Sequence, residues 1–191
     1  MALLTNVSLI RTGYVRGQFT SDPDGVFAVV EPKHIRESGT IEANSIERTT
    51  ELKPPAHHQL RKGDVLFVPR GPSHPAAQVL SEHVNGPLRC AVASSQLYIL
   101  RTDDRLRPAY LAWYLNQKRA QSYFETFGRG ATIASVNQQI LGELPIPVPS
   151  RSRQDTIAQI AQLADREAHL AQQLQRKRAV LVDTLLHHAS Q

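Results

Sequence analysis

Apolar and polar positions follow different patterns on the two sides of residue 150. Before it, short apolar runs are separated by Pro, Gly and charged residues, a pattern typical of β-strands joined by turns. From Arg151 to Gln191 the chain has no Pro, no Gly and no aromatic residue and is rich in Ala, Leu, Gln and Arg, which are strong helix formers. The pattern predicts a globular domain over residues 1–150 and one long helix over residues 151–191.

Four segments of the globular domain carry the apolar runs expected of strands, and they are Gly25–Val30, Val65–Val68, Ala76–Leu80 and Cys90–Leu100. The stretch Arg61–Asp64 predicts the turn before the second of them. One helix is predicted over Pro108–Phe124, with Trp113, Tyr114 and Phe124 expected in the core. The fold class is therefore α+β, a globular mixed domain with a twisted, largely antiparallel sheet and short helices, followed by one long C-terminal coiled-coil helix.

The start of the long helix is marked in the sequence. The proline-rich stretch Leu144–Pro149 excludes helix. Ser150 or Ser152 can then cap the helix, and Asp155 is expected in its first turn, facing the positive end of the helix dipole. Apolar residues follow at alternating steps of three and four, as in a coiled coil. Those expected to face a partner helix are Ile157, Ile160, Ala164, Ala171, Leu174, Leu181 and Leu185.

A second apolar stripe, which includes Leu163 and Leu170, makes this face wider than a strict coiled-coil seam. From Arg153 to His188 such a helix would extend about 54 Å, further than the domain before it can cover. It is therefore expected to pair with another helix or with a second chain. The alternative is a C-terminal helix that lies on its own domain.

Composition and charge narrow the class of protein without naming a partner. The 191 residues include 22 Lys and Arg against 17 Asp and Glu, a net charge of +5, which favours a polyanionic partner only weakly. A hydrophobic fraction of 41% excludes full disorder. Neither a membrane-spanning run nor a signal peptide is recognised, and the single cysteine, Cys90, fits a reducing cytoplasm.

Residue patterns that would indicate catalysis were sought and not found. The chain has no Gly-Lys dipeptide for a phosphate-binding loop, and Lys53–Ala56 lacks the Asn and the aromatic residue of an adenine-methyltransferase motif. The His pairs at positions 57–58 and 187–188 would point apart on one strand or helix, so no metal site is predicted. Ser73 and His74 are sequence neighbours, which is not the geometry of a catalytic triad. The absence of these catalytic patterns indicates a binding protein and not an enzyme.

Two stretches, taken together and in this order, resemble a known family. Leu60–Gly71 has a leucine, basic residues, Gly-Asp, an apolar strand and a basic-glycine loop. Gly128–Asn137 has a Gly-Arg-Gly loop before Ser-Val-Asn, and Ile140–Pro149 leads into the long helix. The combination resembles the specificity (S) subunit of type I restriction–modification systems, in a half-size form with a single target recognition domain and one conserved spacer helix.

The chain departs from the family pattern in two ways. Its helix opens with the basic stretch Arg151–Asp155, where family members often have acidic or Glu-Gln residues. It also has one recognition domain and one spacer helix, where a full subunit usually has two of each.

The resemblance implies a non-catalytic, sequence-specific double-stranded DNA-recognition subunit of a methyltransferase complex. As a homodimer joined by its helices, it would read a split palindromic site and dock type I modification (methyltransferase) subunits. S-adenosylmethionine would be held by the modification subunit and no cofactor by this chain, and a restriction subunit is a further partner that the resemblance leaves open. The alternative is a protein-interaction or assembly-regulating relative that pairs through its long helix and does not bind DNA.

Two loops hold the residues expected to contact DNA. The first offers the guanidinium of Arg70, the hydroxyl of Ser73 and the imidazole of His74, and an arginine can bond guanine at two atoms. In the second, Gly128–Gly130, the glycines let the backbone approach a phosphate that Arg129 would neutralise. The alternative for this second loop is a helix C-cap.

Basic residues outside these loops are weaker candidates. Arg16 and Lys33 are expected to follow the phosphate backbone, with a solvated surface position as the alternative. Ser135 and Asn137 are expected to satisfy a turn instead of touching DNA.

Overall fold

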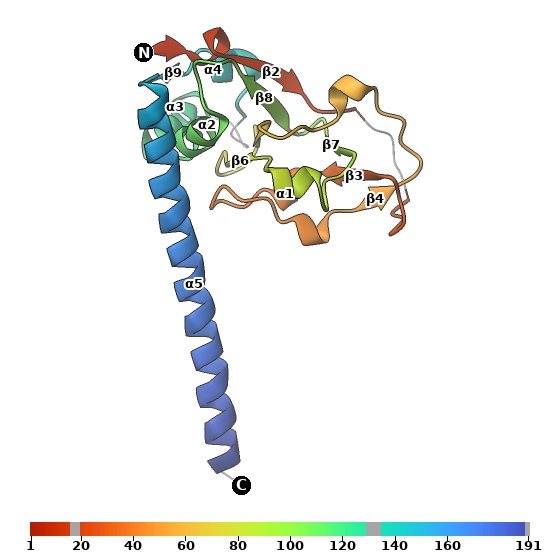
Figure 1. Ribbon diagram of the computed structural model, residues 1–191, viewed down its shortest axis with the longest axis vertical. Helices are drawn as coiled ribbons and strands as arrows, with labels where there is room; N and C mark the ends of the chain where they lie inside the picture. The colour runs from red at the N-terminus through yellow and green to blue at the C-terminus, as the bar shows by residue number, and fades with distance from the viewer. Residues whose placement is uncertain (16–19, 129–134, 190–191) are drawn as a thin grey trace. The chain divides into compact units, whose positions relative to one another are not determined.

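The structure, a computed structural model, describes residues 1–15, 20–128 and 135–189 (Figure 1). The chain divides into two units, Met1–Asp155 and Thr156–Gln191, and each is described by itself. The second unit consists of the greater part of helix α5 (Arg151–Ala189). The prediction of one long C-terminal helix is therefore confirmed.

A four-stranded antiparallel sheet lies in the first unit. Its strands, in spatial order, are β2 (Ser8–Thr12), β8 (Tyr98–Thr102), β5 (Val65–Phe67) and β6 (Ala76–Gln78). The register of the three strand pairs brings Thr12, Tyr98, Phe67 and Ala76 into one row at the same end of the sheet. Loops that leave the sheet at this end are therefore neighbours in space, although they are far apart in the sequence.

A second sheet and a short strand pair complete the β-structure of the described residues. The second sheet has the order β4 (Arg48–Thr49), β3 (Phe27–Val30) and β7 (Ala91–Ala93). Strand β3 is antiparallel to β4 and parallel to β7. Strand β1 (Ala2–Leu3) pairs with β9 (Pro145–Ile146) in antiparallel fashion. The predicted α+β class with largely antiparallel strands is confirmed, with β3–β7 as a parallel exception.

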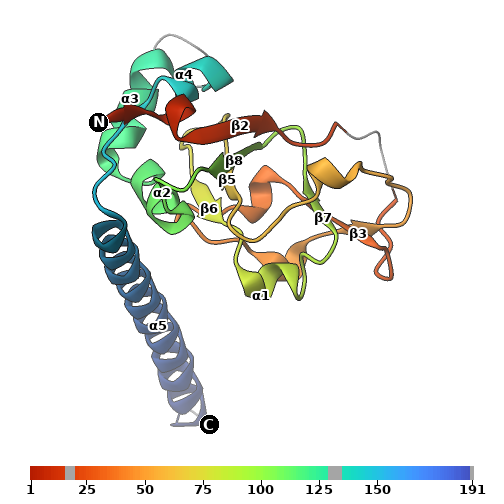
Figure 2. The same cartoon turned by 45° about the horizontal axis from the view of Figure 1, so that its top comes forward.

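Apolar side chains of both sheets form the core. Figure 2 shows the strands β2, β8, β5 and β6 of the first sheet together with β3 and β7 of the second. Fully buried members include Val30, Leu66, Ala77, Ala93 and Leu97, and each large aliphatic side chain contributes about 1.5–3 kcal/mol by leaving water. Phe67 of β5 contacts Phe124 edge to face, with ring centroids 5.2 Å apart. Phe124 and Tyr114 are buried as predicted, whereas Trp113 is only half-buried.

The segments predicted as strands are strands in the structure, although each is shorter than its apolar run. Residues 25–30, 65–68 and 76–80 contain β3, β5 and β6. Residues 90–100 contain β7 and the start of β8, separated by a turn in which Leu97 N–H donates to the carbonyl of Ser94 at 3.0 Å. The predicted turn before β5 is also present, with Gly63 at φ +90°.

The single helix predicted over Pro108–Phe124 is wrong, because the structure has α2 (Pro108–Leu115) and α3 (Lys118–Gly128) instead. The break falls at Asn116. Its side-chain amide accepts the N–H of Ala76 at 2.9 Å and donates to the carbonyl of Ala76 at 2.7 Å. These two bonds hold the end of α2 against β6, a tertiary contact that helical periodicity does not reveal.

Short helical segments connect the strands. They are α1 (Ser81–Val84), α4 (Gln138–Gly142) and four single 3-10 turns, Leu4–Asn6, Pro32–His34, Ala43–Ser45 and Ala56–His58. Asn137 caps α4, since its side-chain oxygen accepts the N–H of Ile140 at 2.8 Å. The expectation that Asn137 satisfies a local turn is thus confirmed.

Helix α5 begins at Arg151, directly after the proline-rich stretch. The carbonyl of Ser150 accepts the N–H of Gln154 at 3.0 Å. Asp155 does not lie in the first turn as expected. Its carboxylate instead binds the guanidinium of Arg107, with Nη2–Oδ2 at 3.0 Å, because the loop before α2 approaches the helix at this point.

Gln154 is the polar anchor of the first turn of α5. Its side chain is fully buried. The Oε1 atom accepts the backbone N–H of Arg107 at 2.7 Å, and Nε2 donates to the carbonyls of Arg105 and Pro149, both at 2.8 Å. Three backbone groups of the loop before α2 and of the proline-rich stretch are therefore satisfied by one side chain.

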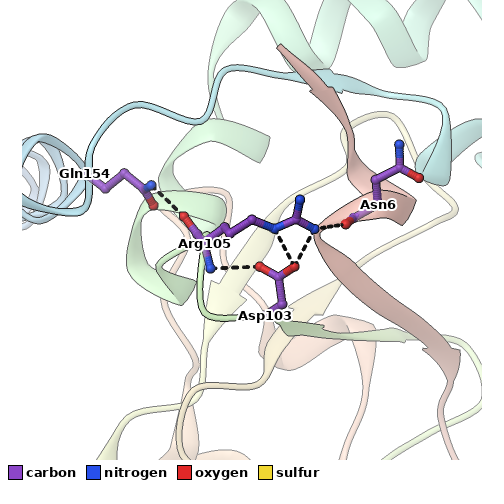
Figure 3. Close-up of polar contacts among 4 residues, drawn as sticks. All are labelled: Asn6, Asp103, Arg105 and Gln154. Carbon is purple, nitrogen blue, oxygen red and sulfur yellow. Dashed lines mark hydrogen bonds and ion pairs between the residues drawn. The ribbon is translucent and has the colours of Figure 1, made fainter.

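Arg105 extends this network toward the N-terminal segment. Figure 3 shows the guanidinium of Arg105 between the carboxylate of Asp103 and the carbonyl of Asn6. The backbone carbonyl of Arg105 accepts a hydrogen bond from Nε2 of Gln154. The hydrogen bond from Arg105 lowers the pKa of the Asp103 carboxyl below its ordinary value. The first turn of α5, the loop before α2 and the N-terminal segment are thus joined within the first unit.

In the second unit, the predicted apolar stripe of α5 is exposed to solvent. Exposed fractions are 63% for Ile160, 51% for Leu174, 59% for Leu181 and 60% for Leu185. Ala164 and Ala171 are also exposed, whereas Ile157 is half-buried. A shallow apolar groove on this helix is lined by Leu163, Arg166, Glu167, Leu170, Ala171 and Leu174. None of the described helices is long and apolar enough to cross a membrane.

Candidate nucleic-acid interface

The predicted DNA-contacting loop that begins at Arg70 lies at the end of the four-stranded sheet, where residues 135–138 pack against it. In the second predicted loop, Gly128–Gly130, residues 129 and 130 lie outside the described residues. Arg70 follows β5 and forms an antiparallel bridge with Ser135. The N–H of Val136 donates to the carbonyl of Pro69 at 2.8 Å. Farther along, the side chain of Gln138 donates to the hydroxyl of Thr12 at 2.7 Å. Residues 135–138 therefore cross the end of the sheet from β5 to β2.

We call this region the sheet rim and define it by Thr12, Tyr98, Arg70, Ser73 and Ser135. Thr12 and Tyr98 belong to the terminal row of the sheet, and the other three belong to the loops that pack over it. Ser135 was expected only to satisfy a turn, and the structure pairs its backbone with Arg70.

Arg70 is the exposed cation of the sheet rim. Among the described residues, no hydrogen bond or ion pair of its guanidinium is found. Its charge reaches Tyr98, where burial raises the pKa of the phenol and the nearby Arg70 opposes that rise. An exposed, unpaired guanidinium on a short loop can bind a phosphate or a guanine edge without first breaking an internal contact.

Ser73 lies in the same loop as Arg70, but it has an acidic neighbour. Its hydroxyl donates to the carboxylate of Glu37 at 3.1 Å. No sequence pattern indicated that Glu37 would lie here, because it comes from a turn that lies 36 residues earlier. The loop that carries the cation Arg70 therefore also holds the carboxylate of Glu37, through the hydroxyl of Ser73.

His74 belongs to the core and not to the interface, so its assignment as a DNA contact is corrected. The residue is only 3% exposed. Its imidazole lies against Phe67 and Phe124, and Nδ1 lies 3.1 Å from the carbonyl of Val68. Because a carbonyl only accepts, Nδ1 carries the proton. Burial lowers the pKa of His74, which favours the neutral form of the ring.

Lys33 is exposed but already paired. Its ammonium lies 3.0 Å from the carboxylate of Glu31 and 3.1 Å from that of Glu47, and hydrogen bonds to these two residues raise the pKa of Lys33. One positive charge shared by two carboxylates is a poor phosphate ligand, since the local charge is negative. The candidates Arg16 and Arg129 lie outside the described residues.

Comparison with solved structures shows which known proteins share this fold. No protein-family model and no curated protein matches the sequence, but solved structures do. A chain of a type I restriction–modification (R-M) system, from a study of its complex assembly and conformational transition, matches with a TM-score of 0.61 and 18% identity, covering 96% of this chain and 42% of that one.

Two further matches are specificity subunits. The S subunit of a type I restriction–modification system from M. genitalium matches with a TM-score of 0.55 and 16% identity over 86% of this chain and 38% of that chain. The HsdS subunit from Thermoanaerobacter tengcongensis matches with a TM-score of 0.58 and 17% identity over 91% of this chain and 38% of that chain. The chain has the specificity-subunit fold. It spans about two fifths of the length of these matched chains.

Within the specificity-subunit fold, the Gly-Asp motif before β5 has a structural role that the sequence did not indicate. Asp64 is almost fully buried. Its carboxylate accepts Nε of Arg101 at 2.7 Å, Nη2 of Arg101 at 3.1 Å and the backbone N–H of Arg61 at 2.9 Å. The hydrogen bonds that Arg101 donates to the Asp64 carboxylate raise the pKa of Arg101. This ion pair joins the turn before β5 to the neighbouring strand β8.

The adjacent histidines do not follow the sequence-based expectation. His57 and His58 lie on a 3-10 turn with ring centroids 4.5 Å apart, so their side chains do not point apart as predicted. Burial lowers the pKa of His58, and the neighbouring His57 adds to the effect. Within the described part of the chain, no group of three metal-ligating side chains is found.

Proposed function

We propose that this chain is a sequence-specific double-stranded DNA-recognition subunit of a type I restriction–modification methyltransferase. The observation that carries the proposal is the specificity-subunit fold, which covers 96% of the chain in one match. The proposal is supported by the sheet rim, where the loop with Arg70, which the sequence predicted to face DNA, is exposed and pairs with Ser135. The chain would read DNA and supply no catalytic group.

Recognition at the sheet rim would combine two kinds of contact. Arg70 is proposed to bond a guanine edge or a phosphate, since its guanidinium is free to do so. Ser73 is proposed to contribute through its hydroxyl. Arg16 and Arg129 remain proposed phosphate contacts, because phosphate contacts set the register of a protein on the duplex while base contacts supply the specificity.

Replacing Arg70 by Ala is expected to weaken binding to the preferred duplex by about 1–3 kcal/mol, because a bidentate contact to one base or a phosphate contact is lost. The control is Arg176→Ala, which removes an exposed arginine of α5. Binding to a duplex selected from a random library would be followed by fluorescence anisotropy over a range of salt concentrations. If both variants bind every duplex as the unmodified chain does, Arg70 is not a DNA contact.

The homodimer is a further part of the proposal, and it is supported by the exposed apolar stripe of α5. Several large aliphatic side chains along one helix are more than half exposed, and two such faces would cover one another in a two-fold pair. A homodimer of this kind would present two sheet rims and would read a split palindromic site.

Leu174→Glu is expected to raise the dimer dissociation constant by at least about tenfold, because it places a charge in the apolar groove of α5 that would be buried in a dimer. Gln172→Glu is the matched control, since it adds the same charge at an exposed polar position of the same helix. Sedimentation equilibrium gives the mass of each variant. A monomeric unmodified chain, both alone and with its modification subunit, would rule out the symmetric scheme.

The catalytic partner is proposed to be a type I modification subunit that binds S-adenosylmethionine and transfers the methyl group. It would dock on α5 and on the recognition domain, and a restriction subunit could join the same complex. The lone cysteine is consistent with a cytoplasmic location for this assembly.

A second candidate function is a protein-interaction or assembly-regulating role without DNA binding. The exposed stripe of α5 favours it, and so do the carboxylates that accompany Lys33 and Ser73. The two functions are separated by exposing the purified protein, with its modification subunit, to a random duplex library at low salt. Enrichment of one motif with steep salt dependence supports DNA recognition, and no enrichment supports the interaction role.

A further inference from the structure

Glu37 is held in place by the turn on which it sits. Residues 35–41 form a hairpin in which Arg36 N–H donates to Thr40 and Gly39 N–H donates to Arg36, both at 2.9 Å. Gly39 adopts φ +79°, a left-handed conformation that glycine reaches without strain. Glu37 occupies the first central position of this tight turn, so its backbone direction is set.

The tip of this hairpin packs against Asn116 and the start of β6. A Cβ atom on Gly39 would lie 2.6 Å from Nδ2 of Asn116 and 3.1 Å from the carbonyl of Ala76, so only glycine allows this close approach. Asn116 is itself bonded to both backbone groups of Ala76. The hairpin is therefore packed where β6 begins, next to the loop that carries Arg70 and Ser73.

A hydrogen bond also sets the orientation of the Glu37 carboxylate. Its Oε1 atom accepts the hydroxyl of Ser73 at 3.1 Å while the residue remains exposed to solvent. Ser73 lies three residues after the unpaired Arg70. A carboxylate in this position repels phosphates and so weakens general attraction to DNA. This carboxylate can contribute favourably to the free energy of DNA binding only by accepting a hydrogen bond from a base.

We infer that Glu37 is a specificity-determining residue of the sheet rim, whose carboxylate accepts a hydrogen bond from the exocyclic amino group of a cytosine in the major groove. The inference rests on the proposed DNA-recognition function. Guanine O6 and N7 and thymine O4 are acceptors, and the carboxylate repels them. Adenine has an amino group too, but it lies beside the acceptor N7, whereas cytosine presents its amino group alone. The hydroxyl of Ser73 positions the carboxylate, and Arg70 in the same loop reaches a neighbouring base or phosphate.

Three variants test the inference. Glu37→Gln keeps the size of the side chain and removes its charge. Ser73→Ala removes the tether and leaves the carboxylate. Glu42→Gln is the matched control, because Glu42 lies just after the same hairpin, where it pairs with the exposed Arg36. The probes are the duplex that the unmodified chain selects from a random library, every single-base-pair variant of it, and a scrambled duplex.

Glu37→Gln is expected to bind the selected duplex about tenfold more weakly, a loss of about 1.4 kcal/mol, and to lose its preference for cytosine at one base pair. It is expected to bind the scrambled duplex equally well or more tightly, because one repulsive charge is gone. Ser73→Ala should show a smaller loss at the same base pair, and Glu42→Gln no change in preference. A misfolded variant would bind both duplexes more weakly, so undiminished binding to the scrambled duplex excludes that explanation.

Two results would overturn the inference, and they are distinguishable. If the unmodified chain selects no duplex, the proposed function fails and the role of Glu37 fails with it. If a duplex is selected and Glu37→Gln keeps the same preference at every base pair, Glu37 has no role in specificity while the proposed function stands.

Discussion

Asp64→Asn is expected to lower the free energy of unfolding by about 3 kcal/mol, the lower part of the range for breaking a buried ion pair. The Asp64 side chain is 3% exposed and that of Arg101 is 22% exposed, so some water reaches the guanidinium and moderates the loss. Asparagine keeps one acceptor oxygen but leaves Arg101 without its counter-charge. Chemical denaturation of the whole chain, followed by circular dichroism, measures the change.

The control for Asp64 is Glu42→Gln, which breaks the exposed pair with Arg36. That pair is expected to contribute at most about 1 kcal/mol, since water screens it. Equal losses for Asp64→Asn and Glu42→Gln would show that burial adds nothing to the Asp64–Arg101 pair. A double-mutant cycle with Arg101→Met isolates the coupling between the two side chains.

Gln154→Ala is expected to lower the free energy of unfolding by about 3 kcal/mol, because three hydrogen bonds of about 1 kcal/mol each are lost. The backbone N–H of Arg107 and the carbonyls of Arg105 and Pro149 would lose their partner. Thermal and chemical denaturation of the whole chain measure the effect.

Two further variants sharpen this second expectation. Gln154→Glu keeps the shape of the side chain but sets a carboxylate against the carbonyls of Arg105 and Pro149, so it should also destabilise. Gln172→Ala removes an exposed glutamine from the same helix and is expected to change stability by no more than about 0.5 kcal/mol. If Gln154→Ala lowers the free energy of unfolding as little as Gln172→Ala does, the buried amide does not anchor the start of α5.

These anchors and the sheet rim have different consequences for the proposed function. Asp64 and Gln154 hold the scaffold, so their loss should reduce stability before it changes any sequence preference. Arg70 and Glu37 are exposed, and Ser73 is half-buried and bonded to Glu37, so their loss should change DNA binding while the fold persists. Measuring both stability and binding for each variant separates the two groups.

Much of the candidate site was predictable, and the remainder depended on contacts between distant segments. The loop with Arg70 and Ser73 was found from its basic and turn-forming residues. His74 was misassigned because its burial depends on Phe67 and Phe124, which come from different elements. Lys33 was predicted as a phosphate contact because its ion pairs were not visible in the sequence. One of its two acidic partners, Glu47, lies 14 residues after it. Glu37 was missed, although Arg36–Gly39 has the residues of a tight turn.

The sequence by itself determined the α+β class, the strands β3, β5 and β6, and the long helix after the proline-rich stretch, because those features follow from local preference and periodicity. Tertiary structure decided the contacts between distant segments, which the periodicity of the sequence does not reveal. Asn116 ends α2 by binding Ala76, Asp64 is buried against Arg101, and Arg70 lies beside Ser135. Each of these contacts joins residues at least 37 positions apart, so its energy appears only when the chain has folded.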